Sequence, residues 1–349
     1  MKKINNVGVV GMTGLVGRHV HKLLEVLHTP IKRLVPFGHS AIGSTIMTFW
    51  SEEKKLSIDV NNFLNLDVVM HCAGGDVSRE LIPQLLEVYP DQFQIDASSA
   101  FRMEPDWFLS LPEINGIGDK PSQRLYAGSN CTTAGLVLAL GPLHKKFTLE
   151  NFRVSTYQAA SGAGQKGLDD LEAEEAGEVP KHGKFDPHGL RHNVLPCIAL
   201  ARQDLGYTWE ELKTRLETNK ILNADIRSSA TAVRIGIPRA HSEAISIQLK
   251  DKVTLDDILE VWQTCPWLVI KNDINNHLYP TPKSVTGKCI VEVGRLRIDT
   301  AEEDDGCHFC CFISFDQLLV GAAYNLVNIL RLLIDPTDKL HPPKQAILA

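Results

Sequence analysis

The chain has 349 residues, enough for two packed domains with a large buried core. Hydrophobic residues make up 44% and charged residues 22%, proportions typical of a soluble globular protein. The formal net charge is −6, so there is no basic field to attract nucleic acid or an anionic membrane. Any anionic substrate must therefore be bound by a few well-placed arginine and lysine residues.

The eight cysteines favour a reduced, cytoplasmic protein without a metal site. Only Cys307 and Cys310 have C-x-x-C spacing, and they lie in the alternating segment CHFCCFISF, where a strand would use them as small core residues. Zinc would need two further ligands that are not evident. The N-terminal segment runs directly into a strand and a glycine turn, unlike a secretory signal. No apolar run approaches the ~18 residues that would span a bilayer.

The first third of the chain alternates short apolar runs with helical patterns, which predicts a parallel, doubly wound α/β sheet of the Rossmann type. One segment, Thr45–Val60, has no helix of its own and is expected to make a local antiparallel excursion. The expected strands are Val7–Val10, Arg33–Phe37, Asp67–Cys72 and Phe93–Asp96, and the expected helices are Leu15–Leu27 and Val77–Val88.

After residue 131 the pattern changes to strands without regular helical crossovers, which predicts an α+β domain with a mixed or antiparallel sheet. A polar stretch, Gly162–His192, reads as a helix with an irregular lobe. The expected strands are Phe152–Ala159, Ser246–Leu249, Cys289–Ile298 and His308–Phe315, and the expected helices are Thr133–Phe147 and Leu318–Leu333. We therefore expect a dinucleotide-binding domain over 1–131, completed by 320–349, and a catalytic and dimerisation domain over 132–319.

The segment VGVVGMTGLVG carries glycines at 11, 14 and 17, directly after a strand and at the start of a helix. Glycines there permit a tight turn and close approach of the backbone to a pyrophosphate, whose charge lies at the helix N-terminus. A purely structural turn is the alternative. The cofactor contacts expected from this turn are Gly11, Thr13, Gly14, Leu15, Val16 and Gly17.

The second strand is followed by His39 and Ser40, where an NAD enzyme usually places an acidic residue for the ribose hydroxyls. These donors favour a 2′-phosphate and hence NADP, although His39 could equally be a plain loop residue.

The segment GSNCTTAGLVLAL places Cys131 at or near the start of an apolar helix that Asn130, Thr132 or Thr133 can cap. The positive end of a helix dipole favours the thiolate, which is the nucleophilic form of cysteine. By itself this cysteine is as easily a buried hydrophobic residue.

The Asn-Cys-Thr helix start resembles the nucleophile site of aspartate-semialdehyde dehydrogenases, and further segments resemble that family in its order from about residue 7 to 330. Two of them, LETNKIL and FDQLLVGAA, look most like the Gram-negative bacterial branch. The segments are IDASSAFRM (95–103), VSTYQAASGAG (154–164), LETNKIL (216–222), VRIGIPRAHS (233–242), VGRLRID (293–299) and FDQLLVGAA (315–323).

The resemblance implies an enzyme that reduces aspartyl phosphate to aspartate semialdehyde with NADPH through a cysteine thioester, in lysine and diaminopimelate, methionine and threonine biosynthesis. It also implies a homodimer. For catalysis it implies Cys131 as nucleophile, His241 as general acid/base and Gln158 as the group that orients the substrate.

The resemblance assigns the remaining site residues by their place in the same motifs. Arg234 would bind the substrate carboxylate, Glu217 its ammonium group, and Asn130 would complete the substrate site. Arg102 and Lys220 would bind phosphate. Further cofactor contacts are implied for Ser161, Gly162 and Gln317.

The residues themselves support only part of this assignment. Glu217 and Lys220 would share a helix face, but a solvent-exposed ion pair explains that spacing as well. Arg234 and His241 would lie on opposite faces of an unbroken strand, although Gly236 and the proline at 238 break it, and His241 could be an ordinary turn histidine. Arg102 follows a loop beyond the carboxyl end of a strand, where doubly wound sheets bind ligands.

Some positions depart from the family pattern. Met12 replaces a common alanine in the glycine turn, and Ala73 stands where relatives can carry a polar residue that faces the cofactor. The stretch KHGKFDPHGLRH (181–192) matches nothing in the family. Its histidines at 182, 188 and 192, with Asp186, fit no known metal spacing, so we expect a solvated loop.

Two other functions remain open. An N-acetyl-γ-glutamyl-phosphate reductase would share the glycine turn, the cysteine and the histidine, but would not need a carboxylate for a free amino group, so Glu217 argues against it. A catalytically silent NADP-binding relative would be expected to lose Cys131, Gln158 or His241, and all three are present.

Overall fold

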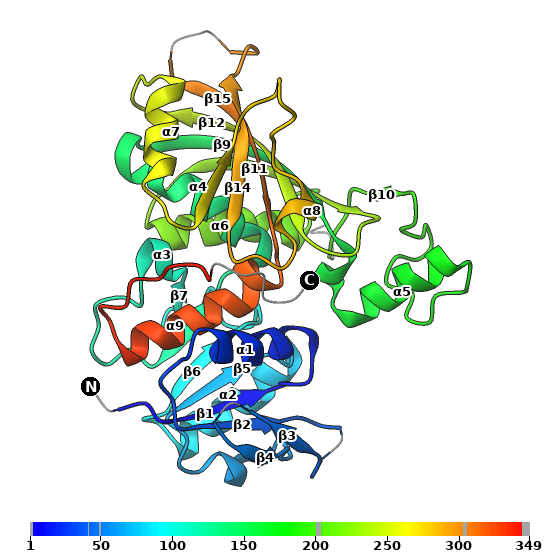
Figure 1. Cartoon of the computed structure of the whole chain (residues 1–349), viewed down its shortest axis with the longest axis vertical. Coiled ribbons are helices and arrows are strands. Elements are labelled where there is room, and N and C mark those ends of the chain that lie inside the picture. The colour runs from blue at the N-terminus through cyan, green and yellow to red at the C-terminus, as the bar shows by residue number, and fades with distance from the viewer. Residues whose placement is uncertain (1–2, 41, 49, 200–203, 303–305, 344–349) are drawn as a thin grey trace. The chain divides into compact units, whose positions relative to one another are not determined.

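The computed structural model describes residues 3–40, 42–48, 50–199, 204–302 and 306–343, and the chain forms two compact units. The first unit consists of Met1–Asn130 together with Ala322–Pro343, and the second of Cys131–Gly321. Figure 1 labels their elements along the chain. No described helix is long and apolar enough to cross a membrane.

The first unit is built on a six-stranded parallel sheet with the order β2-β1-β5-β6-β8-β7, which confirms the predicted doubly wound domain. Its central strands are buried on both faces, as their apolar, β-branched sequences predict. The strands are β1 Asn6–Val10, β2 Arg33–Phe37, β5 Val68–His71, β6 Phe93–Asp96, β7 Phe108–Ser110 and β8 Leu125–Gly128. The helices are α1 Leu15–Val26, α2 Gly75–Val88, α3 Pro112–Asn115 and α9 Tyr324–Ile334, with a 3-10 turn, η1, at Val60–Phe63.

A small antiparallel pair lies beside β2 and confirms the predicted excursion. It consists of β3 Thr45–Met47 and β4 Glu52–Lys54. Arg33 at the start of β2 makes a two-pronged ion pair with Glu53 of β4, at 2.7 and 2.8 Å, so the pair is fastened to the sheet. The chain then runs alongside the end of β2, where Leu56 bridges Phe37.

The second unit contains a mixed seven-stranded sheet in the order β10-β11-β9-β12-β15-β14-β13, as predicted for this half of the chain. Its strands are β9 Leu149–Gln158, β10 Val194–Leu195, β11 Arg227–Ile235, β12 His241–Leu249, β13 Leu268–Lys271, β14 Val291–Ile298 and β15 His308–Phe315. Its helical elements are α4 Cys131–Phe147, η2 Ala160–Ala163, α5 Gln165–Ala176, α6 Trp209–Leu222, α7 Leu255–Gln263 and α8 Pro282–Val285.

The largest differences from the expected elements concern one strand and one helix. The strand expected at Ser246–Leu249 begins five residues earlier, because His241, Ser242 and Glu243 are buried polar residues that hide its apolar alternation. The single helix expected at Leu318–Leu333 is a π turn, η3 Leu319–Ala323, followed by α9.

The loop at 181–192 is largely exposed, as predicted, with His182, His188, His192 and Asp186 at the surface, but contacts with α5 and two buried apolar residues anchor it. Asp170 of α5 accepts hydrogen bonds from the backbone N–H groups of His182 and Lys184 at 2.9 and 2.8 Å. Phe185 and Leu190 are buried in a small apolar cluster under α5. Carboxylates on one helix therefore order this loop, and the described residues contain no group of His, Cys, Asp or Glu side chains that could hold a metal ion.

The prediction that Cys307 and Cys310 are small core residues is only partly right: Cys307, just before β15, is buried, but Cys310 is half-buried. Cys311 is 2% exposed and belongs to the core. Cys310 points to the other face of the sheet, where its Sγ lies 3.4 Å from Ser246 Oγ.

Candidate active site

Cys131 is the first residue of α4, which confirms the predicted position at a helix N-terminus. The helix is buried on all sides except near its ends, so its position in the second unit is fixed by packing. Gly321 lies against the nucleophile: a Cβ on this glycine would come within 2.6 Å of Cys131 Cα. The backbone at Gly321, in the π turn η3, therefore packs directly against the backbone and Cβ of Cys131.

Three site side chains meet because their strands are neighbours in one sheet. Gln158 at the end of β9 is the register partner of Arg234 in β11. His241 begins β12, and the next residue, Ser242, pairs with Tyr157 of β9. The turn after β11 puts Arg234 and His241 on two different strands. Their seven-residue spacing therefore does not place them on opposite faces of one strand.

His241 is fully buried with its Nε2 at 3.7 Å from the Sγ of Cys131. Burial, and then the positive charge of Arg234, hold the pKa of His241 well below its usual value of 6.5, so the ring is neutral at pH 7. The backbone N–H of Ala159 donates to its Nδ1 at 3.1 Å, which assigns the ring proton to Nε2. The proton thus faces the sulfur.

Arg234 is 6% exposed, and its Nη1 donates to the carbonyl of Ala159 at 2.6 Å. Among the described residues this is the one hydrogen bond of its guanidinium, so the remaining donors are available to an anionic ligand. Gly162 lies directly against this pair of side chains, since a Cβ there would be 2.4 Å from Arg234 Nη1 and 3.3 Å from His241 Nε2.

Gln158 is 1% exposed and donates to Thr156 Oγ1 at 3.2 Å. Gln317 accepts from the backbone N–H of Ala240 at 2.9 Å and donates to the hydroxyl of Ser161. The Ser161–Gln317 pair therefore ties η2 to the start of β12, close to His241. The cofactor contacts expected of Ser161, Gly162 and Gln317 stay predictions.

Glu217 and Lys220 lie on α6, as the LETNKIL segment predicts. Glu217 is 1% exposed and Lys220 half-buried, which contradicts the alternative of a solvent-exposed ion pair. Thr208 caps the helix in a capping box with Glu211. The binding roles expected of Glu217 and Lys220 stay predictions.

Glu210 is a site residue that the sequence did not reveal. It lies two turns before Glu217 on the same face of α6 and is 7% exposed. Burial lowers the pKa of Arg234, and the charges of Cys131 and then of Glu210 partly offset this effect. The hydroxyl of Thr132 donates to Glu210 Oε1 at 3.4 Å. In the sequence it is one of two glutamates in a helix first turn, where acidic residues commonly serve the helix dipole, so no signal distinguished it.

The glycine turn in the first unit fits a dinucleotide. Gly11 has φ +80°, a conformation that favours glycine. A Cβ on Gly17 would lie 2.2 Å from the Gly11 carbonyl, so only glycine allows α1 to pack this closely on the turn. Thr13 and Gly14 are exposed, Leu15 and Val16 begin α1, and the exposed His39 and Ser40 follow β2.

Arg102 and Asn130 are the other expected site residues of the first unit. Arg102 is 7% exposed and donates to the carbonyls of Gly128 and Ala97 at 2.8 and 2.9 Å. These bonds place it beyond the carboxyl ends of β6 and β8, as predicted. Asn130 is buried at the end of the loop that follows β8.

A parallel dinucleotide-type unit, followed by a second unit in which a cysteine faces a histidine, is the arrangement of a nicotinamide-dependent oxidoreductase. The sequence model described as "Semialdehyde dehydrogenase, NAD binding domain" matches residues 6–118, and that described as "Semialdehyde dehydrogenase, dimerisation domain" matches residues 140–320. The chain belongs to the semialdehyde dehydrogenase family.

Its relatives include proteins named aspartate-semialdehyde dehydrogenase. The protein from Aquifex aeolicus is 36% identical, covering 94% of this chain and 97% of the relative, and that from Bacillus subtilis is 34% identical, covering 93% and 96%. A crystal structure of aspartate semialdehyde dehydrogenase II from Vibrio cholerae matches with a TM-score of 0.86 at 26% identity, over 96% of this chain and 99% of that one. These similarities do not favour the reductase alternative. The assignment to a Gram-negative branch stays a prediction.

Proposed function

We propose that the protein is an NADP-dependent aspartate-semialdehyde dehydrogenase that makes L-aspartate 4-semialdehyde from L-4-aspartyl phosphate. The observation that carries the proposal is the approach of His241 Nε2 to Cys131 Sγ, 3.7 Å, beside the buried cation Arg234. The names of the relatives at 34–36% identity support the substrate. This reaction supplies the lysine, diaminopimelate, methionine and threonine pathways.

Catalysis starts with attack of the Cys131 thiolate on the acyl carbon of aspartyl phosphate. The C–S bond forms, the acyl–oxygen bond to phosphate breaks, and a thioester remains on Cys131. NADPH, when bound, supplies the hydride that reduces this thioester. The Nε2–H of His241 donates a hydrogen bond to the oxyanion of the resulting thiohemiacetal. The oxyanion then re-forms the carbonyl bond as the C–S bond breaks, which releases the aldehyde and the Cys131 thiolate.

Charged side chains bind the two ends of the substrate. Arg234 offers its remaining N–H donors to the α-carboxylate as a planar fork. Glu217 binds the ammonium group, and Gln158 and Asn130 hold the acyl group in position. Arg102 and Lys220 bind the departing phosphate. The burial of Arg234 beside Cys131 and His241 supports its role, because a buried guanidinium with unused donors is stabilised by an anionic partner.

The glycine turn of the first unit would hold the pyrophosphate of the cofactor, with His39 and Ser40 near its adenosine ribose. Gly11, Gly14 and Gly17 leave the backbone open to close approach, and Thr13, Leu15 and Val16 border it. Ser161, Gly162 and Gln317 are proposed to contact the cofactor from the second unit. The chain belongs to a family whose first domain is described as NAD binding.

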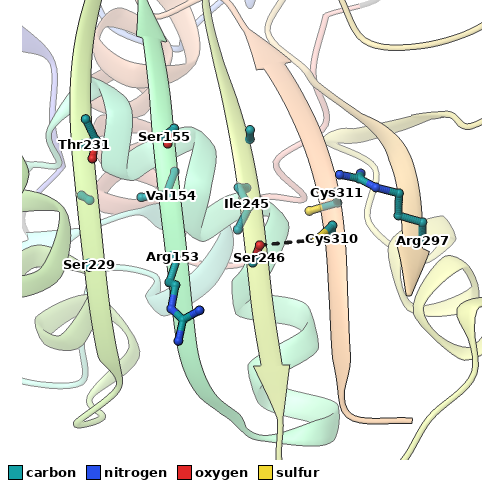
Figure 2. A pocket seen from close by; sticks show the side chains of 12 residues that line it. Arg153, Val154, Ser155, Ser229, Thr231, Ile245, Ser246, Arg297, Cys310 and Cys311 are labelled. Atoms are coloured by element: carbon teal, nitrogen blue, oxygen red, sulfur yellow. Dashed lines mark hydrogen bonds between the residues drawn. The ribbon is translucent and has the colours of Figure 1, made fainter. Parts of the chain in front are cut away.

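A homodimer is proposed on the description of the second matched domain as a dimerisation domain. Figure 2 shows one face of its sheet, with Arg153, Ser229 and Ser246 around a hollow. Arg153 and Ser229 are exposed and Ser246 is half-buried, and polar side chains in such an array suit a self-complementary two-fold contact. Light scattering should give twice the chain mass. The eight free cysteines agree with the proposed cytoplasmic location.

The direct test follows absorbance at 340 nm with purified protein, L-aspartate semialdehyde, phosphate and NADP. Phosphate-dependent NADPH formation that disappears in a Cys131→Ala protein would establish reaction class, nucleophile and substrate together. Activity only with N-acetylglutamate semialdehyde would transfer the proposal to the related reductase. Silence with both substrates and with NAD would leave the silent cofactor-binding relative.

A further inference from the structure

Lys55 is a buried lysine at the glycine turn of the first unit. Its side chain is 2% exposed, and its Nζ donates to the Thr13 hydroxyl at 3.0 Å. Within the described residues this neutral hydroxyl is its one hydrogen-bond partner, and no carboxylate pairs with it. A buried ammonium group with so little compensation is unfavourable unless an anion joins it.

The backbone around Lys55 is held firmly at the end of β2. Its N–H donates to the Ser44 carbonyl and its carbonyl accepts from Gly43, each at 2.9 Å. The next residue, Leu56, donates to the carbonyl of Pro36 in β2, also at 2.9 Å. The position of the lysine is therefore set by the sheet rather than by its own flexible chain.

The Lys55 side chain fits over Gly38 because this glycine has no side chain of its own. A Cβ on Gly38 would lie 2.6 Å from Cε and 3.0 Å from Nζ of Lys55. The lysine thus crosses directly over the residue that follows β2 and ends at Thr13, which is exposed in the turn after β1. Figure 1 shows β2 with the β3–β4 pair beside it.

In folds of this type the adenosine ribose lies beyond the carboxyl end of the second strand. An acidic residue there binds the 2′-hydroxyl of NAD, and a cation there accommodates the 2′-phosphate of NADP. We propose that Lys55 binds the 2′-phosphate and sets the preference for NADP(H) over NAD(H). This inference rests on the proposed function and deepens it, since His39 and Ser40 alone supply no fixed positive charge.

A purely structural lysine would behave differently from a phosphate ligand. If Lys55 only ties the β2 end to Thr13, its loss would weaken the glycine turn and reduce the affinity for both cofactors alike. A 2′-phosphate ligand affects only the cofactor that carries this group. The ratio of the two dissociation constants therefore separates the two roles.

The experiment measures Kd for NADPH and NADH by fluorescence titration of the full-length protein, without substrate. Lys55→Met removes charge and donor, and Lys55→Gln keeps a donor without the charge. Lys54→Met is the matched control, because Lys54 is exposed and its Nζ donates to Thr45 Oγ1. We expect both Lys55 variants to raise Kd for NADPH about 10- to 100-fold, with NADH within about 3-fold, and Lys54→Met to change neither.

Equal loss of affinity for both cofactors, or no loss for either, would overturn the inference. Gly38→Ala gives a second test that keeps the lysine, because its new methyl group fills the space that the lysine side chain occupies. It should weaken NADPH binding selectively, and unchanged discrimination would contradict the geometry. Because no turnover is required, a selective effect would stand even if the aspartate-semialdehyde assay were silent.

Discussion

The two units build their sites in different ways. In the first unit the dinucleotide turn is a run of seven residues whose function lies in the backbone, with glycines at 11, 14 and 17 that leave it exposed. In the second unit the site consists of side chains, and the two that approach each other, Cys131 and His241, are 110 residues apart. Substitutions in the second unit should therefore impair chemistry in a stable protein, whereas substitutions in the first should impair packing and cofactor binding.

The largest effect is expected for Cys131→Ala, which removes the nucleophile. The rate of phosphate-dependent NADPH formation should fall by at least about 10⁴-fold, because no thioester can form. Thermal unfolding should be nearly unchanged. Cys197→Ala, at an exposed cysteine, is the matched control and should retain full activity. Substantial activity in the Cys131 variant would rule out covalent catalysis at this residue.

His241→Asn should reduce kcat/KM by about 10²–10⁴-fold, since it removes the proton donor that faces the sulfur. The pKa of His241 is lowered, so the imidazole gains its second proton only below its ordinary value of about 6.5. The pH profile of wild-type kcat/KM should thus show no histidine-dependent fall between pH 6.5 and 8. An acid limb centred near pH 7 that vanishes in the variant would contradict the neutral assignment.

Arg234→Lys should lower kcat/KM by about 10²-fold, chiefly through KM for the semialdehyde, because a point charge cannot reproduce two parallel hydrogen bonds to a carboxylate. Arg215→Lys, at an exposed arginine of α6, serves as the control. Steady-state kinetics with both proteins make the comparison. Wild-type efficiency in Arg234→Lys would refute the carboxylate role.

Gly17→Ala tests the first unit, whose proposed cofactor site is formed by the backbone of the glycine turn. Its Cβ would meet the Gly11 carbonyl at 2.2 Å, so α1 must shift away from the turn. We expect a loss of about 1–3 kcal/mol in unfolding free energy, together with weaker binding of both cofactors. Gly75→Ala is the control, since the nearest atoms to its new methyl group belong to the flexible Arg79 guanidinium, at 3.3 Å. Denaturant unfolding measures both variants.

The same contrast explains what could be predicted from the sequence. The glycine turn and strands such as Phe93–Asp96 follow from local pattern, because their function or burial is a property of contiguous residues. Gln158, Arg234 and His241 lie close together because of the register between their strands. No local sequence pattern encodes that register, so only the family resemblance indicated that these residues share a site. Glu210 and Lys55 were missed because both are buried, whereas a charged residue in a sequence is by default expected at the surface.

Glu243 provides a specific test of the second unit, whose site is formed by side chains. It lies two residues after His241 on β12, is fully buried, and neither carboxylate oxygen has a hydrogen-bond partner within the described residues. Burial raises its pKa well above the usual 4.5. The folded protein therefore binds a proton that the unfolded chain releases, so the contribution of Glu243 to stability is complete below about pH 4.3 and declines as pH rises towards and through the folded-state pKa.

Glu243→Gln replaces the neutral acid by a neutral amide of the same shape and removes this pH dependence. The melting temperature of the variant relative to wild type should rise as the pH is raised above 5. Glu260→Gln, an exposed glutamate of α7, should show no such trend. A difference that is constant with pH would mean that Glu243 is ionised in the folded protein, and an unrecognised cation would then have to lie beside it.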